Sequence, residues 1–249
     1  MHATRTAAVD AAYLLPHLQP GWDLLDVGCG PGTITAGFSE IVAPGRVVGV
    51  DVAPEIVAAA ATAFPEVHFE AAEAGDLPYP DGSFDVAHAH QVLQHLTDPV
   101  DALVEMRRVV RPDGLVAARE VDYGTMTWWP ADPRLDRWLD LYHRVARGNG
   151  AEPDAGRRMV DWFAGAALGA LEVTASAVVY ADEPGRHFWG GGWAERVVAS
   201  PFADQAVGRG HATAGELHDI AEAWRRWADT PNGTLSYTNI EVVARVPSG

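Results

Sequence analysis

The chain has 249 residues, a formal net charge of −16 and 48% hydrophobic residues. This suits one α/β domain with an elaborated lid, or one large domain and a small one. All eighteen basic residues are arginine, which excludes a Schiff-base lysine and a phosphate-loop lysine. The acidic surface repels nucleic-acid phosphates and anionic membranes. No apolar run approaches the ~18 residues of a membrane span. Because there is also no signal-peptide core and only one cysteine, Cys29, we expect a cytoplasmic protein.

The first predicted elements surround a glycine-rich turn. Residues 4–19 predict an amphipathic helix that Pro16 kinks or ends. An apolar run then ends in Asp26, and glycines follow at positions 28, 30 and 32. This pattern predicts a buried strand, a tight turn and a helix over 33–42. Without a Cβ, glycines let the backbone turn sharply and let a ligand lie against its amides. Thr33 stands where a dinucleotide fingerprint has its third glycine, which disfavours NAD.

A second strand, over residues 47–51, ends in Asp51 about 20 residues after the turn. In nucleoside-binding α/β folds an acid at this place accepts hydrogen bonds from ribose hydroxyls. Asp51 is also a candidate N-cap for the next predicted helix, over 54–63. Further strands are predicted over 67–70, 84–89 and 115–121. A helix over 98–109 and a turn at 111–114 precede the last of them.

Beyond residue 122 the predicted elements are helices over 133–147, 155–169, 193–199 and 214–228, with strands over 172–180 and 234–246. Eight of the nine tryptophans lie beyond residue 127. Four of them are predicted to wall the binding site of a flat, apolar ligand: Trp128, Trp129, Trp189 and Trp193. The glycines at 190–192 would let their segment close. The alternative is that these tryptophans are packing residues between lid and main domain.

Residues 24–35, 47–52, 69–96 and 109–116 resemble, in order, the motifs of class I S-adenosylmethionine-dependent methyltransferases. They are most similar to the small-molecule, type 11 branch that includes ubiquinone and menaquinone C-methyltransferases. The resemblance implies an α/β fold with a Rossmann-like, doubly wound sheet of seven strands, mostly parallel with the last strand antiparallel. It implies a cofactor-binding core over 1–122. The rest of the same domain, 123–249, would carry acceptor-binding lid insertions near 123–155 and 182–233.

The resemblance also implies which residues bind S-adenosylmethionine and its product S-adenosylhomocysteine. The glycine turn and Asp26 would hold the amino-acid tail, and Asp51 would hold the ribose. Glu73 would hold the adenine with the amide of the next residue, Asp76 being the rival acid. The predicted cofactor-binding set is Asp26, Gly28, Cys29, Gly30, Gly32, Asp51, Val52, Glu73, Ala74, His90 and Gln91, with the last two beside the sulfur.

Methyl transfer from a sulfonium is an in-line displacement, in which the protein chiefly aligns the reactants and excludes water. A general base matters only if the acceptor must lose a proton. The candidates are His90, Asp122, Tyr123 and His143, and packing or capping is the alternative for each. No His/Cys cluster has zinc spacing and no carboxylate trio indicates magnesium, so no metal is expected.

The sequence thus predicts a methyltransferase acting on a small, largely apolar or aromatic metabolite, in specialised metabolism or quinone-type biosynthesis. C- or O-methylation is favoured, because residues 90–93 replace the Asn/Asp-Pro-Pro-aromatic motif of amino-group methylases. The alternatives are a non-catalytic adenosyl-binding subunit of a larger assembly and an NAD-linked oxidoreductase. The expected partner is a small molecule, not a nucleic acid or a membrane. A homodimer is compatible with the sequence.

Overall fold

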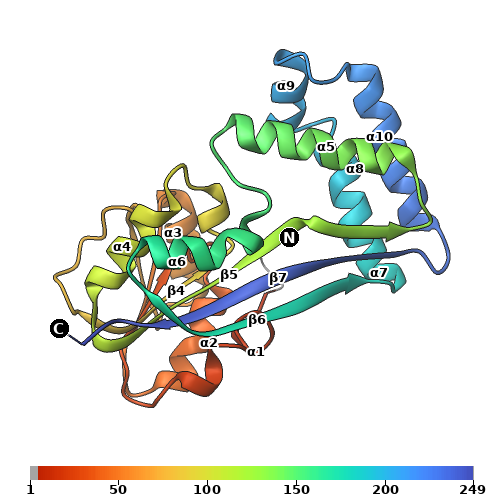
Figure 1. The fold of residues 1–249 in the computed structure, drawn as a ribbon. Coiled ribbons are helices and arrows are strands. Elements are labelled where there is room, and N and C mark those ends of the chain that lie inside the picture. The colour runs from red at the N-terminus through yellow and green to blue at the C-terminus, as the bar shows by residue number, and fades with distance from the viewer. Residues whose placement is uncertain (1–4, 249) are drawn as a thin grey trace. The chain divides into compact units, whose positions relative to one another are not determined.

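The computed structural model describes residues 5–248 and contains one seven-stranded sheet with the order β3-β2-β1-β4-β5-β7-β6 (Figure 1). Strands β1 to β5 pair in parallel, and β7 runs antiparallel to β5. The predicted fold class is therefore confirmed. The strands are β1 (Leu24–Val27), β2 (Val47–Asp51), β3 (His68–Ala71), β4 (Phe84–His90), β5 (Val110–Trp129), β6 (Gly169–Tyr180) and β7 (Thr234–Arg245).

Helices connect most of the strands, and several of them begin with a side-chain cap. Asp98, for example, caps α4 by accepting the N–H of Asp101 at 3.2 Å. The α-helices are α1 (Ala7–Asp10), α2 (Thr33–Val42), α3 (Pro54–Ala63), α4 (Pro99–Val109), α5 (Pro133–Gly148), α6 (Met159–Gly165), α7 (Glu183–Arg186), α8 (Gly192–Arg196), α9 (Pro201–Gly208) and α10 (Ala214–Asp229). The short 3-10 and π segments are η2 (Leu15–His17), η3 (Leu93–His95), η4 (Ala155–Arg158) and η5 (His187–Gly191).

The chain forms two compact units. Among the described residues, unit 1 comprises 121–154 and 176–239, and unit 2 comprises 5–120, 155–175 and 240–248. Strands β5, β6 and β7 contribute residues to both units. The stretches 123–155 and 182–233 lie almost wholly in unit 1. Their role as an acceptor-binding lid stays a prediction.

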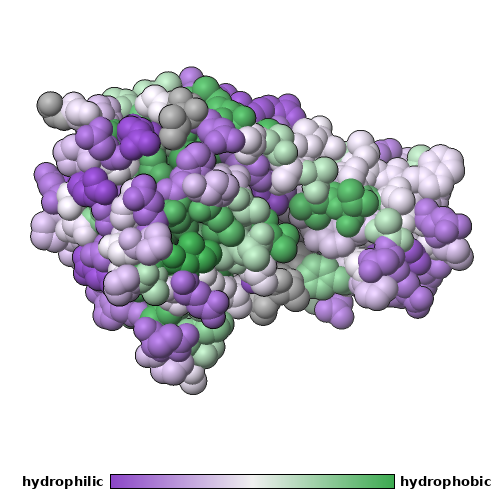
Figure 2. Space-filling model, turned by 90° about the horizontal axis from the view of Figure 1, so that it is seen from below, coloured by the Kyte–Doolittle hydropathy of each residue, from purple (hydrophilic) through white to green (hydrophobic). Residues whose placement is uncertain are grey.

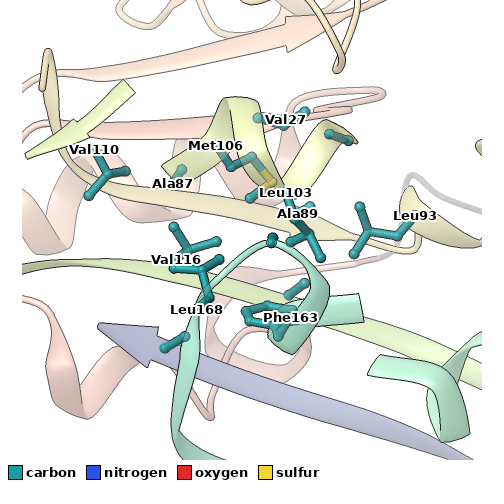
Figure 3. Packing of buried hydrophobic residues seen from close by; sticks show 14 of the residues in the cluster. Val27, Ala87, Ala89, Leu93, Leu103, Met106, Val110, Val116, Phe163 and Leu168 are labelled. Atoms are coloured by element: carbon teal, nitrogen blue, oxygen red, sulfur yellow. The ribbon is translucent and has the colours of Figure 1, made fainter. Parts of the chain in front are cut away.

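In unit 2, hydrophobic layers cover both faces of the sheet. On one face, Leu103 and Met106 of α4 pack against the small residues of β4, and Phe163 of α6 packs near Val116 of β5 (Figure 3). On the other face, helices α1, α2 and α3 contribute a second cluster that includes Phe38. All four residues of β1 are buried, as expected for a parallel strand that is covered on both sides. The end of β1 is therefore held rigidly where the glycine turn begins.

The core of unit 1 is a cluster of aromatic rings. Trp138 of α5 meets Trp193 and Trp224 edge to face, with ring centroids 4.6 and 4.9 Å away. These are favourable geometries for aromatic pairs, each worth about 0.5–1.5 kcal/mol beyond area burial. Trp189 joins the same cluster through Tyr180, at a centroid distance of 5.1 Å. Much of the tryptophan content thus builds this core.

Several predicted elements differ from the structure. The helix predicted over 155–169 is the 3-10 turn η4 followed by α6, which ends at Gly165, and the turn predicted at 111–114 lies within β5. The helix expected over 4–19 is divided into α1 and the 3-10 turn η2, which contains Pro16; residue 4 lies outside the described residues. The strand expected to end at Val121 continues to Trp129. The glycine segment expected to close like a lid is helical. A Cβ on Gly190 would lie 2.9 Å from the carbonyl oxygen of Trp224, so this glycine permits close packing against α10.

The face shown in Figure 2 mixes hydrophilic residues with several hydrophobic patches. Strand β6 has one exposed row of small apolar side chains, with Val173 48% and Val179 59% accessible. Among residues 5–248, no helix combines the length and the apolar character needed to cross a membrane.

Candidate cofactor site

Unit 2 contains a cavity of about 700 Å³ at the carboxyl ends of β1, β2, β3 and β4. Ligands of open α/β sheets bind at this edge. Four segments line the cavity: the glycine turn, the end of β2, the loop after β3 and the residues after β4. All members of the predicted cofactor set except Gly32 line it, namely Asp26, Gly28, Cys29, Gly30, Asp51, Val52, Glu73, Ala74, His90 and Gln91.

The amides of the glycine turn bond within the protein, contrary to the expectation that they face a ligand. Those of Gly28 and Cys29 donate to the carbonyl of Val50 at 2.7 and 2.9 Å, and that of Gly32 donates to the carbonyl of Cys29 at 3.1 Å. The amide of Gly30 donates to the Asp51 carboxylate at 3.0 Å. The turn is therefore fixed to the end of β2 by its own backbone.

The three glycines have different roles, although all have positive φ (70°, 53° and 80°). A Cβ on Gly28 would lie 2.3 Å from a methyl group of Val92, and one on Gly32 would lie 2.8 Å from the ring of Phe69. These two glycines permit close packing. A Cβ on Gly30 would meet no atom within 4 Å. Because Gly30 lines the cavity, its missing side chain leaves room for a ligand.

Asp26 anchors the floor of the cavity. Its side chain is nearly inaccessible, and its two oxygens accept hydrogen bonds from Thr35 Oγ1 at 2.6 Å and from His88 Nδ1 at 2.7 Å. Thr35 and His88 are both fully buried. A buried carboxylate is tolerated when its oxygens have such partners. Asp26 thereby links β1 to α2 and β4.

Asp51 ends β2 with its carboxylate between two backbone amides. One oxygen accepts the N–H of Gly30 at 3.0 Å, and the other accepts the N–H of Ala53 at 3.1 Å. The prediction that Asp51 is the N-cap of α3 is wrong, because the N-cap is Ala53 and Asp51 accepts the amide of that residue. Each carboxylate oxygen can accept more than one hydrogen bond, so these contacts are compatible with a ligand role for Asp51. Both oxygens stay oriented toward the cavity edge by this pair of bonds.

The two rival acids of the loop after β3 are placed differently. Glu73 lines the cavity together with Ala74 and Gly75, whereas Asp76 does not. The N–H of Asp76 donates to the carbonyl of Glu73 at 3.1 Å, which closes the loop. Of the two acids, the geometry favours Glu73 as the ligand-facing residue.

The segment after β4 is held by a buried acid that sequence reasoning did not single out. The amides of Val92 and Leu93 donate to one oxygen of Glu120 at 2.8 and 2.7 Å. Burial raises the pKa of Glu120 to about 8, while these amides and the charge of Arg5 oppose the rise. Gln91, just before them, has a positive φ of 53°, a conformation that is uncommon for residues other than glycine. Glu120 thus supports the cavity wall from beneath.

The cavity is also lined by residues outside the predicted cofactor set, among them Arg5, Ile56 and His95. Arg5 precedes α1, and its Nη2 donates a hydrogen bond to Oε1 of Gln91. Burial, and then the charge of Arg5, lowers the pKa of His95. One signal in the sequence could have pointed to Arg5. Because the chain has no lysine, only an arginine can supply a permanently cationic side chain for an anionic ligand group.

The candidate bases do not lie together in one unit. His90, 6% accessible, lines the unit 2 cavity, whereas Asp122, Tyr123 and His143 belong to unit 1. Asp122 accepts the N–H of Gly124 at 3.1 Å. Burial, followed by the neighbouring Tyr142, raises the pKa of Tyr123 above its ordinary value, so its phenol keeps its proton at neutral pH.

His143 has defined contacts on both ring nitrogens. Nδ1 lies 2.8 Å from the carbonyl of Leu139, and Nε2 lies 2.8 Å from the carboxylate of Asp154. Arg147 donates to the other oxygen of that carboxylate at 2.7 Å. His143 and Arg147 line a separate cavity of about 550 Å³ in unit 1. The base role of all four residues stays a prediction.

The predicted tryptophan wall has buried and exposed members. Trp128 lines the unit 1 cavity, and Trp129 is 66% accessible with its carbonyl bonded to the indole of Trp227. Trp189 and Trp193 are each 4% accessible and belong to the unit 1 core. Of these four predicted tryptophans, Trp128 and Trp129 are therefore the two with accessible side chains.

Two further features of the predicted site are the reactivity of Cys29 and the question of a bound metal. Burial and the adjacent Asp26 and Asp51 charges raise the pKa of the Cys29 thiol, which disfavours the nucleophilic thiolate. Among the described residues, no three His, Cys, Asp or Glu side chains are grouped so that they could hold a metal ion.

A Rossmann-like sheet with a cavity at its carboxyl edge and an acid at the end of β2 is an arrangement typical of nucleoside-binding α/β proteins. Residues 25–118, all in unit 2, match a family model described as a methyltransferase domain. A methyltransferase of Schizosaccharomyces pombe, itself uncharacterised, is 34% identical over 256 residues, which cover 97% of this chain and 91% of that protein. The chain therefore belongs to the methyltransferase family.

Two other similar proteins have named activities. The nocamycin O-methyltransferase of Saccharothrix syringae is 38% identical over 104 residues, which cover 39% of this chain and 37% of that protein. A geranyl diphosphate C-methyltransferase of Streptomyces coelicolor, solved with Mg²⁺, geranyl diphosphate and S-adenosyl-L-homocysteine, superposes with a TM-score of 0.57. That match has 16% identity and covers 96% of this chain and 80% of that one. The structural match supports the fold.

Proposed function

We propose that this methyltransferase uses S-adenosylmethionine and methylates a small, largely apolar or aromatic metabolite at carbon or oxygen. The observation that carries the proposal is the cavity of about 700 Å³ in unit 2. Four segments that are distant in sequence, and that share a motif order with S-adenosylmethionine-dependent enzymes, line this cavity together. The open position above Gly30 and the paired oxygens of Asp51 fit a nucleoside with an amino-acid tail.

Each wall of the cavity suits one part of this cofactor. Asp51 would accept hydrogen bonds from the ribose hydroxyls. Glu73 and the amide of Ala74 would hold the adenine, and the exposed apolar side chains of Val52 and Ile56 would cover its ring. Asp26 would attract the ammonium group of the tail. His90 and Gln91 would lie nearest to the sulfur.

When bound, S-adenosylmethionine supplies an activated methyl group. The protein then has to align the acceptor with it and keep water out. His90 is nearly inaccessible and lines the cavity, so it is the first candidate to take a proton from an acceptor that must lose one. Trp128 lines the separate cavity of unit 1 and offers an aromatic surface there. The named substrates of the two similar enzymes are also small molecules, which supports this substrate class.

The proposal is tested by calorimetry with S-adenosylhomocysteine and NADH as separate ligands. We expect S-adenosylhomocysteine to bind and NADH not to bind. The protein would then be incubated with methyl-labelled S-adenosylmethionine and small-molecule extracts, with mass spectrometry of the products. A labelled small product would support the proposal. NADH binding without S-adenosylhomocysteine binding would overturn it. Tight cofactor binding, with turnover only in the presence of a second protein, would instead indicate an adenosyl-binding subunit.

Substitution of two glycines separates backbone strain from ligand contact. Gly30 and Gly21 both have positive φ (53° and 89°), and a Cβ on either would meet no atom within 4 Å. Gly30→Ala and Gly21→Ala should therefore both cost about 1–2 kcal/mol of stability. Only Gly30→Ala places a methyl group in the cavity, and we expect at least tenfold weaker S-adenosylhomocysteine binding in calorimetry. Equal affinities for the two variants would show that the ligand does not approach the turn.

A further inference from the structure

The cavity of unit 2 has an uneven distribution of charge. Three carboxylates line it, those of Asp26, Asp51 and Glu73, and Arg5 is the only arginine among its lining residues. The sequence contains no lysine. The three carboxylates would attract the ammonium group of a ligand that carries both an ammonium and a carboxylate. Arg5 is the one permanent cation of the cavity lining that would attract the carboxylate. The carboxylate would be repelled by the three acids wherever it lay far from Arg5.

Arg5 is held at the cavity by a defined contact. Its guanidinium donates a hydrogen bond to the side-chain oxygen of Gln91, directly after β4. Gln91 is itself fixed, because its amide donates to the carbonyl of Arg119 at 2.8 Å. The charge of Arg5 also reaches into the site, since it lowers the pKa of His95. A guanidinium presents a planar set of donors that matches a carboxylate in a bidentate manner.

We propose that Arg5 binds the carboxylate of the methionyl tail of S-adenosylmethionine and S-adenosylhomocysteine, and thereby attaches the segment before α1 to the bound cofactor. This inference rests on the proposed function. It assigns the two ends of the tail to different elements: the ammonium to Asp26 at the end of β1, and the carboxylate to Arg5. The tail would then bridge the N-terminal segment and the glycine turn.

The test compares two ligands that differ in the tail. S-adenosylhomocysteine has the amino-acid group, whereas 5′-methylthioadenosine keeps the adenine, ribose and sulfur but lacks the carboxylate. Calorimetry would measure both ligands with the wild-type protein and Arg5→Gln. We expect Arg5→Gln to weaken S-adenosylhomocysteine binding at least tenfold and to change 5′-methylthioadenosine binding less than twofold. Arg5→Lys, which keeps the charge, should recover part of the loss.

A matched control removes one positive charge away from the cavity. Arg144→Gln is suitable, because Arg144 is exposed on α5 of unit 1 and pairs with Asp140 of the same helix. It should bind both ligands as the wild-type protein does. Unchanged S-adenosylhomocysteine binding in Arg5→Gln, or equal weakening of both ligands, would overturn the inference and leave the proposed function intact. If the wild-type protein binds neither ligand, both the proposed function and the inference fail.

Discussion

The stability of this protein should fall as the pH rises from about 5 to about 8, and Glu120→Gln should remove much of that dependence. Glu120 is fully buried, and burial raises its pKa from 4.5 to about 8. Between these values the folded state holds a proton that the unfolded state has released. The free energy of unfolding therefore decreases with pH by about 1.4 kcal/mol per unit through this one group. Below the lower value both states are protonated, and nothing is lost.

The size of the effect makes Glu120 one of the most informative positions to mutate. Between pH 5 and pH 8 the loss would reach about 4 kcal/mol, a large part of the 5–15 kcal/mol that stabilises a typical domain. Glutamine keeps an oxygen that can accept the amides of Val92 and Leu93, but it has no charge to bury. The difference in unfolding free energy between Glu120→Gln and the wild-type protein should thus grow with pH and level off above about pH 8.

Urea unfolding at five pH values between 5 and 9 would measure this difference. Glu120→Leu serves as the comparison, because it removes the acceptor as well as the charge. It leaves two backbone amides without their partner, at a cost of about 1–3 kcal/mol each, and should be less stable than Glu120→Gln at every pH. Parallel pH profiles for Glu120→Gln and the wild-type protein would show that Glu120 is ionised throughout and that its pKa is not raised.

Asp26→Ala is expected to lower the free energy of unfolding by about 3–5 kcal/mol. The substitution removes a buried charge and leaves two buried groups, the hydroxyl of Thr35 and the ring of His88, without their acceptor. Thr35→Val removes only one of these hydrogen bonds and should cost about 1 kcal/mol. Thr35 does not line the cavity, so Thr35→Val should also keep its affinity for S-adenosylhomocysteine.

Urea unfolding of the two variants at one pH would give both free energies, and calorimetry below the unfolding transition would give the affinities. The informative quantity is the loss of unfolding free energy in Asp26→Ala relative to the loss in Thr35→Val. If Asp26→Ala costs no more than Thr35→Val, then the carboxylate is not the anchor between β1, α2 and β4. Normal ligand binding by a folded Asp26→Ala protein would remove Asp26 from the binding site but not from the core.

Much of unit 2 was predictable because its signals are local. Helices α2 and α3 have the boundaries that the glycine turn and Pro54 predict, and the family model matches this part of the chain. Strand β5 was predicted too short. Its continuation depends on β7, more than a hundred residues away: the N–H of Thr238 donates to the hydroxyl of Thr125, and Thr127 lies beside Ser236. Such pairing has no signal in the local pattern.

The site shows the same division between local and distant causes. The motif residues reached the cavity with the exception of Gly32, whose Cβ position is occupied by Phe69 of β3. Arg5 and Glu120 were missed as site residues because they act through partners that only the fold brings near. The glycine-rich segment before α8 was expected to move. The close contact of Gly190 with α10 is a different reason for a glycine at this position. Periodicity does not distinguish a hinge from a tight helix contact.

The division of unit 2 into three stretches of chain has a consequence for its synthesis. The ribosome releases residues 5–120 first, yet the unit also requires 155–175 and 240–248. Strand β7, which lies between β5 and β6 in the sheet, therefore emerges after both of its neighbours. Until then the facing edges of β5 and β6 lack their partner, and such edges invite pairing with other chains. The nascent chain should accordingly depend on chaperones until its seventh strand is available.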